Sequence, residues 1–164
     1  MYAGVALTAA ATLMLELALT RIFSVVFYYH FAFLAISIAL FGLGAGGVLS
    51  YYFSERGEAL FRRLGMLSAL NAVAVVLSLA FTLNLAGRPS SFLTLALVYF
   101  STAIPFLLSG MVVSLAIGES IQRIDRVYFF DLLGAAAGCL LVIPFLNVMG
   151  GPGAVLGAAV LFAS

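Results

Sequence analysis

Two charged side chains, Glu16 and Arg21, interrupt the first long apolar run of the sequence, in the stretch LELALTR. A charge near the centre of a bilayer costs about 2.5 to 3.5 kcal/mol on insertion scales, so such a group is expected to be paired, neutral or next to water. Helical side chains lean toward the N-terminus, so Arg21 can reach back to the Glu16 carboxylate or extend to the membrane surface. The spacing therefore allows an ion pair without requiring one.

Hydroxyl side chains recur on both sides of Glu16 at intervals of four residues. Residues four apart lie on one face of a helix, so these side chains form a polar stripe that is expected to face the inside of a bundle. Two interpretations remain open: a buried polar contact that fixes helix packing, and a site for a ligand or a proton. The polar stripe consists of Thr8, Thr12, Glu16, Thr20 and Ser24.

A second acid, Asp131, precedes the stretch GAAAG, in which Gly134, Ala135 and Gly138 share the face of the acid. Two glycines spaced in this way let another backbone approach closely, so Gly134 and Gly138 predict a helix contact. About 15 Å of helix rise separates the expected depths of Asp131 and Glu16, which argues against a carboxylate pair. Asp131 is expected near the membrane surface, as a structural contact or as a functional group.

The stretch GLGAGG, residues 42–47, matches the glycine pattern of dinucleotide-binding loops. That pattern binds a pyrophosphate only between a strand and a helix, whereas here it ends a long apolar run. Gly42 and Gly46 are therefore predicted to form a helix-packing face.

Several kinds of chemistry lack the residues that they need. The single histidine, His30, cannot build a typical zinc or bis-histidine haem site, and the single cysteine, Cys139, is expected to pack as a small buried side chain. All seven basic residues are Arg and the formal net charge is +1, so no basic surface for nucleic acid is expected. We expect no metal, no cofactor and no catalytic site in this chain, which is therefore not expected to be an enzyme.

The composition indicates how these residues are positioned. Of the 164 residues, 65% are hydrophobic and 8% are charged, and the mean hydropathy is +1.27. The apolar runs reach the roughly 20 residues that a helix needs to cross a bilayer. The sequence predicts a single all-α domain, a polytopic transmembrane helical bundle without a soluble domain. The predicted spans are 3–28, 31–53, 65–86, 92–117 and 128–147, followed by the beginning of an incomplete sixth at 153–164.

Arginines in the loops predict the orientation, because positive residues are retained on the cytoplasmic side. Five lie in the loops after the second and fourth spans, and one lies in the loop after the third. This bias predicts a cytoplasmic N-terminus. The membrane itself is expected to be the cell (cytoplasmic) membrane of a prokaryote. The arginines of the first group are Arg56, Arg62, Arg63, Arg123 and Arg126, and the opposing one is Arg88.

Two long stretches, LELALTRIFSVVFYYHFAFLAISIALFGLGAGG and YFFDLLGAAAGCLLVIPFLNVMGGPGA, resemble the membrane-spanning N-terminal domain of spermidine synthase-like proteins, which are also described as fused transporter and spermidine synthase proteins. The most specific parts are Glu16, Arg21 and Asp131 together with the glycines. In that family a cytoplasmic aminopropyltransferase-like domain usually follows. That nucleotide-binding domain is missing from these 164 residues, so the resemblance carries no catalytic residue over to this chain.

Three functions remain open at this stage. The first is a membrane module that acts as an anchor, a scaffold or a partner subunit. The second is a transporter or binding bundle, centred on Glu16, for a small cationic molecule such as a polyamine, as the resemblance suggests. The third is an accessory subunit that packs against other membrane subunits or a second copy of itself. In each case the chain is expected to lie in, and to contact, the lipid bilayer.

Overall fold

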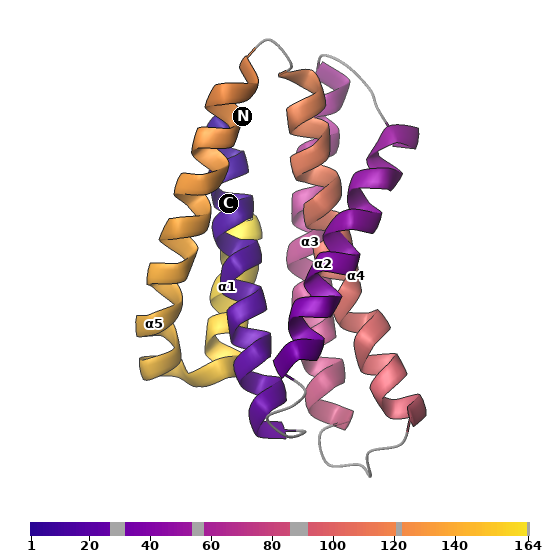
Figure 1. Ribbon diagram of the computed structural model, residues 1–164, viewed down its shortest axis with the longest axis vertical. Helices are drawn as coiled ribbons and strands as arrows, with labels where there is room; N and C mark the ends of the chain where they lie inside the picture. Colours follow the sequence, from indigo (N-terminus) through magenta and orange to yellow (C-terminus); the bar gives the residue numbers. More distant parts are fainter. Residues whose placement is uncertain (27–31, 54–57, 86–91, 121–122, 164) are drawn as a thin grey trace.

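The computed structural model describes residues 1–26, 32–53, 58–85, 92–120 and 123–163. All regular secondary structure in these residues is helical, and the long helices stand side by side as an upright bundle (Figure 1). The predicted all-α helical bundle is thus confirmed. The elements are α1 (Tyr2–Val26), α2 (Ala32–Ser50), the short 3-10 helix η2 (Tyr51–Phe53), α3 (Glu58–Leu85), α4 (Phe92–Glu119) and α5 (Ile124–Ala163).

Within the residues that the structure describes, five helices are long and apolar enough to cross a membrane, by length and composition. Their outer faces expose large apolar side chains such as Phe33, Leu40 and Val148. Large exposed apolar areas of this kind mark contacts with a membrane or with another protein, which agrees with the membrane-spanning character of the helices. The third helix begins at Glu58, whereas hydropathy predicted a span from residue 65. A helix can continue past the hydrocarbon region, so its hydropathy does not mark where it begins.

Successive helices run in alternating directions along the bundle (Figure 1). The beginnings of α1, α3 and α5 therefore lie at one end, together with the ends of α2 and α4. The described loop arginines all belong to this end, at the starts of α3 and α5; they are Arg62, Arg63, Arg123 and Arg126. Arg56, Arg88 and His30 lie outside the described residues. The side of the membrane that this end occupies stays a prediction.

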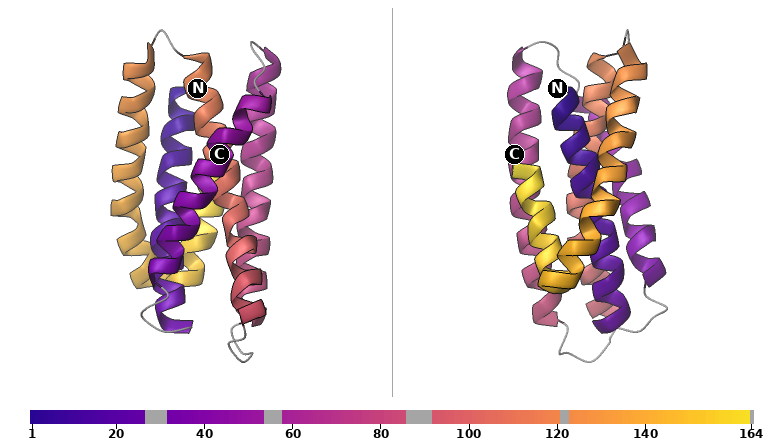
Figure 2. Two further views of the ribbon diagram at one scale, coloured as in Figure 1. Left: turned by 45° about the vertical axis from the view of Figure 1, so that its right-hand side comes forward. Right: turned by 90° about the vertical axis from the view of Figure 1, so that its left-hand side faces the viewer.

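The longest helix, α5, reverses direction at Gly150. A straight helix of 40 residues would be about 60 Å long, roughly twice the thickness of a hydrocarbon core. At Gly150 the backbone leaves the helical conformation, with φ 70° and ψ −174°, a region that is open essentially to glycine alone. We refer to residues 124–149 as the first arm and to residues 151–163 as the second arm. The right-hand view in Figure 2 shows the second arm, in yellow, returning along the bundle.

Pro152 lies in the first turn of the second arm, where the missing N–H costs no helical hydrogen bond. The reversal falls between residue 147, where the fifth predicted span ends, and residue 153, where the sixth was expected to begin. Both segments thus belong to α5 and are separated at Gly150.

The first arm packs against α1 through two glycines. A Cβ added at Gly134 would overlap the carbonyl group of Ala6, and one added at Gly138 would overlap that of Ala10. The two contacts advance together along both helices, so α1 and the first arm are parallel. These are the positions at which the sequence predicted a close helix contact, and the contacting atoms are backbone.

The second arm packs against α1 in the opposite direction. A Cβ added at Gly151 would lie 2.7 Å from Cγ1 of Ile22, and one at Gly157 would lie 2.8 Å from Cε of Met14. As the second arm advances, its contacts move back along α1, so the two segments are antiparallel. Helix α1 therefore packs against both arms of α5, and its buried residues belong to the apolar core.

A further glycine contact joins α2 to α4. A Cβ at Gly42 would lie 2.6 Å from Cβ of Phe106, and one at Gly46 would overlap the carbonyl oxygen of Leu107. From the other side, Gly110 lies against the backbone of Leu43. The stretch GLGAGG thus lies in a helix–helix contact, as its position at the end of an apolar run predicted.

Candidate functional site

The hydroxyl groups of the polar stripe are bonded within their own helix. Each donates its proton to a backbone carbonyl three or four residues earlier, a pattern common for Ser and Thr in helices. These hydroxyls therefore offer no free proton to a ligand. The bonds run from Thr8 to Gly4 (2.9 Å), from Thr12 to Thr8 (2.7 Å), from Thr20 to Glu16 (2.8 Å) and from Ser24 to Arg21 (2.8 Å).

Glu16 and Arg21 are not brought together. The Glu16 side chain is half-buried and that of Arg21 is exposed, and no ion pair joins them within the described part of the chain. Thr8 and Thr12 are buried, whereas Thr20 is half-buried. The polar stripe therefore faces the inside of the bundle at its beginning and turns toward the outside beyond Thr12. Glu16 belongs to the part that is no longer enclosed.

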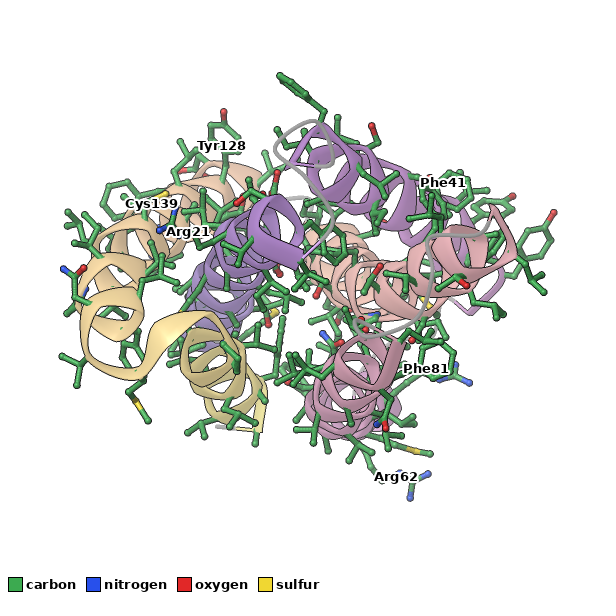
Figure 3. The ribbon with its side chains drawn as sticks, turned by 90° about the horizontal axis from the view of Figure 1, so that it is seen from below. Arg21, Phe41, Arg62, Phe81, Tyr128 and Cys139 are labelled. Carbon is green, nitrogen blue, oxygen red and sulfur yellow. The ribbon has the colours of Figure 1, made fainter. Side chains whose placement is uncertain are left out.

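Cys139 is exposed, so the expectation that it packs as a buried side chain is wrong. It follows Gly138, which faces α1, and one step along a helix turns the next side chain by about 100°. Arg21 and Cys139 are labelled in Figure 3, together with other exposed side chains: Phe41, Arg62, Phe81 and Tyr128.

Asp131 lines a pocket of about 360 Å³ that lies between four helices. It is the only charged residue in the lining, and its half-buried side chain has no hydrogen bond or ion pair to another described residue. Among the remaining lining residues, Thr12 and Ser114 carry hydroxyls and the others are apolar or glycine. We call this space the Asp131 pocket; its lining is Ala9, Thr12, Leu13, Leu43, Gly47, Gly110, Val113, Ser114, Ile117, Asp131 and Ala135.

The protons of both hydroxyls in the Asp131 pocket are already committed. Thr12 donates to the carbonyl oxygen of Thr8. Ser50 donates its single proton to Gly47 at 2.6 Å, so in the 2.7 Å contact between the Ser50 and Ser114 oxygens the donor is Ser114. The side chains of this pocket therefore present hydrogen-bond acceptors and no donor.

The acids Glu16 and Asp131 lie at different depths along the bundle. Because Gly134 lies level with Ala6, Asp131 is level with residue 3 of α1, so about 20 Å of helix rise separates it from Glu16. This spacing agrees with the expectation that the two carboxylates do not form a pair. Of the two, Asp131 is the one that borders the pocket.

A buried polar pair on α3 and α4 was missed from the sequence. Nδ2 of Asn71 donates to Oγ of Ser109 at 2.9 Å, and both side chains are 0% exposed. Oδ1 of Asn71 and Oγ1 of Thr82 have no hydrogen-bond partner within the described residues. The signal was present in the sequence, because polar residues recur along one face of α3. They are Ser68, Asn71, Ser78 and Thr82.

Ser68, at the beginning of this row, donates to the carbonyl oxygen of Phe162 and so joins α3 to the second arm. Together they border a pocket of about 220 Å³ at the end of the bundle where α1 begins. Within the described residues, no group of three or more His, Cys, Asp or Glu side chains is placed to hold a metal ion.

The fold and the pocket define the class only as an all-α bundle with membrane-spanning character. No protein-family model, curated protein or solved structure matches this chain. The resemblance to spermidine synthase-like membrane domains therefore rests on the sequence stretches alone.

Proposed function

We propose that this chain is an integral membrane module that anchors or scaffolds a larger protein or complex and has no catalytic site of its own. The observation that carries the proposal is the packing of α1 against both arms of α5. Glycines allow the close approach in both contacts, and on the first arm backbone atoms lie directly against the backbone of α1. Packed interiors of this kind resist continuous deformation, which suits a permanent support better than a moving carrier.

The alternative of a transporter centred on Glu16 receives less support. Glu16 is half-buried and does not line the Asp131 pocket, and the neighbouring hydroxyls are bonded to their own helix. A substrate site near the middle of the membrane would be expected to expose such groups to a cavity. Polyamine binding at Glu16 therefore stays a suggestion of the sequence resemblance.

The larger protein can be continuous with this chain or a separate subunit. The resemblance favours a cytoplasmic aminopropyltransferase-like domain, and the arginine bias predicts the cytoplasm on the side where α1 begins. A partner in the membrane would pack on the exposed apolar faces instead. For either arrangement, the location that we propose for this module is the cytoplasmic membrane of a prokaryotic cell.

The mass of the protein extracted from its native membrane tests the proposal. We expect a polypeptide larger than the 17.2 kDa of these residues, or a stable complex with a second polypeptide that survives extraction in a mild detergent. Native mass spectrometry distinguishes the two, because only the complex separates when the detergent is exchanged for a denaturing one. A protein of 17.2 kDa that purifies alone as a monomer would contradict an anchoring or scaffolding role.

A further inference from the structure

We infer that the Asp131 pocket binds a small organic ammonium ion with an apolar body. This inference goes beyond the anchoring role, because it assigns a ligand site within the module itself. Its basis is the match between the lining of the pocket and the chemistry of such a ligand.

The polar groups of the pocket select for a hydrogen-bond donor. The Asp131 carboxylate and the oxygens of Thr12 and Ser114 are acceptors, since the two hydroxyl protons are used elsewhere. A protonated amine has up to three donors and no acceptor, so it complements this set. A carboxylate or phosphate ligand would find no side-chain donor here and would meet the negative charge of Asp131.

Charge balance favours the same ligand. Asp131 has no ion pair among the described residues and is the only charged residue in the lining. A carboxylate in apolar surroundings is costly unless it is paired or neutralised. An ammonium ion supplies the missing partner and a charge-assisted hydrogen bond, which is about twice as strong as a neutral one.

The shape of the pocket sets the position of the apolar body. Asp131 lies about 10 Å of helix rise below Ile124, toward the end of the bundle where α5 begins. Leu13 and Leu43 lie toward the middle of the bundle, and Leu43 contacts Gly110 there. An amine bound with its charge on Asp131 thus directs its hydrocarbon chain toward these leucines.

A matched pair of glycines makes the pocket testable without altering its charge. Gly47 lines the pocket, and a Cβ added to it would meet nothing within 4 Å, so a larger side chain can enter the open space. Gly44 on the same helix also has nothing within 4 Å, but it is exposed and does not line the pocket. Leucine is expected to fill the pocket at position 47 and to extend outward at position 44.

The experiment measures the thermal shift of the protein in lipid nanodiscs on titration with n-hexylammonium, n-hexanol and n-hexanoate. We expect a saturable stabilisation by hexylammonium alone. The substitution Asp131→Asn should weaken the apparent affinity about tenfold or more, because it removes a charged hydrogen-bond partner. Glu16→Gln should leave the affinity unchanged, which controls for amine adsorbed to other acids in the membrane.

The leucine variants at Gly47 and Gly44 test the assignment even if Asp131→Asn fails to fold. Gly47→Leu should abolish the saturable shift, whereas Gly44→Leu should keep it. Equal shifts with hexanol and hexylammonium, or an unchanged affinity in either Asp131→Asn or Gly47→Leu, would overturn the assignment of an ammonium site to this pocket.

Discussion

Replacing Gly138 with leucine is expected to prevent α1 from packing on the first arm of α5. A Cβ at this position already overlaps the carbonyl group of Ala10, and a backbone group cannot turn aside as a side chain can. The two helices must separate by the width of a side chain, so the neighbouring contact at Gly134 is lost as well. We expect the free energy of unfolding to fall by about 3 kcal/mol or more, which is at or above the upper end of the range for overpacked cores.

Thermal unfolding in detergent micelles, followed by circular dichroism, measures this effect. The control is Gly44→Leu, because Gly44 is exposed and a Cβ added there meets nothing within 4 Å. Helix propensity favours leucine over glycine equally in both variants, so their difference reports the packing term. Equal stability of the two variants would mean that α1 and the first arm do not touch at Gly138.

Valine at Gly150 is expected to open the reversal of α5. The conformation there, with φ 70° and ψ −174°, costs a residue with a Cβ about 1–3 kcal/mol, and a β-branched side chain belongs at the upper end of that range. No atom lies within 4 Å of a Cβ placed on Gly150, so the penalty comes from the backbone alone. We therefore expect a lower melting temperature with little change in helix content, since each arm remains a helix.

The matched variant for this prediction is Gly118→Val. Gly118 lies in α4, is exposed, and also has nothing within 4 Å of an added Cβ, but its backbone is helical. A melting temperature equal to that of the parent in Gly150→Val would show that the chain does not adopt a left-handed backbone at this position. The control Gly118→Val, by contrast, is expected to keep the melting temperature of the parent protein.

Apolar content and run length were enough to predict the helices, because a backbone in lipid has to satisfy its own hydrogen bonds. The spacing of Gly42 and Gly46, and of Gly134 and Gly138, likewise indicated where helices approach. The partners of these glycines could not be predicted, since GxxxG specifies close approach but not the helix that approaches. Ala6 and Ala10 carry no mark in the sequence that distinguishes them from the other alanines of α1.

The candidate site in the structure lies at Asp131, whereas the sequence pointed first to Glu16. Glu16 lies in the middle of an apolar run among hydroxyls, but its burial depends on which helices cover that face, and the side chain is only half-buried. The sequence predicts Asp131 near the membrane surface. The pocket beside it could not be predicted, because four helices line it and no local sequence pattern shows that these four meet. The acceptor-only lining depends on the bond between Ser50 and Ser114, which are remote in sequence.

The packing of α1 against both arms of α5 depends on the reversal at Gly150, and disulfide crosslinking in membranes tests that reversal most directly. Ser68 and Ala163 line one pocket, and Ser68 donates to the carbonyl of Phe162. If α5 continued straight, Ala163 would lie about 20 Å of helix rise beyond the turn, away from Ser68.

The variants carry Cys139→Ala to remove the exposed native thiol. We predict that Ser68→Cys combined with Ala163→Cys crosslinks readily on mild oxidation or with a short thiol reagent. Ser68→Cys combined with Met149→Cys should not, because Met149 lies at the turn, at the opposite end of the bundle. Failure of the first pair to crosslink, or equally fast crosslinking of the second, would contradict a second arm that returns along the bundle and packs against α1.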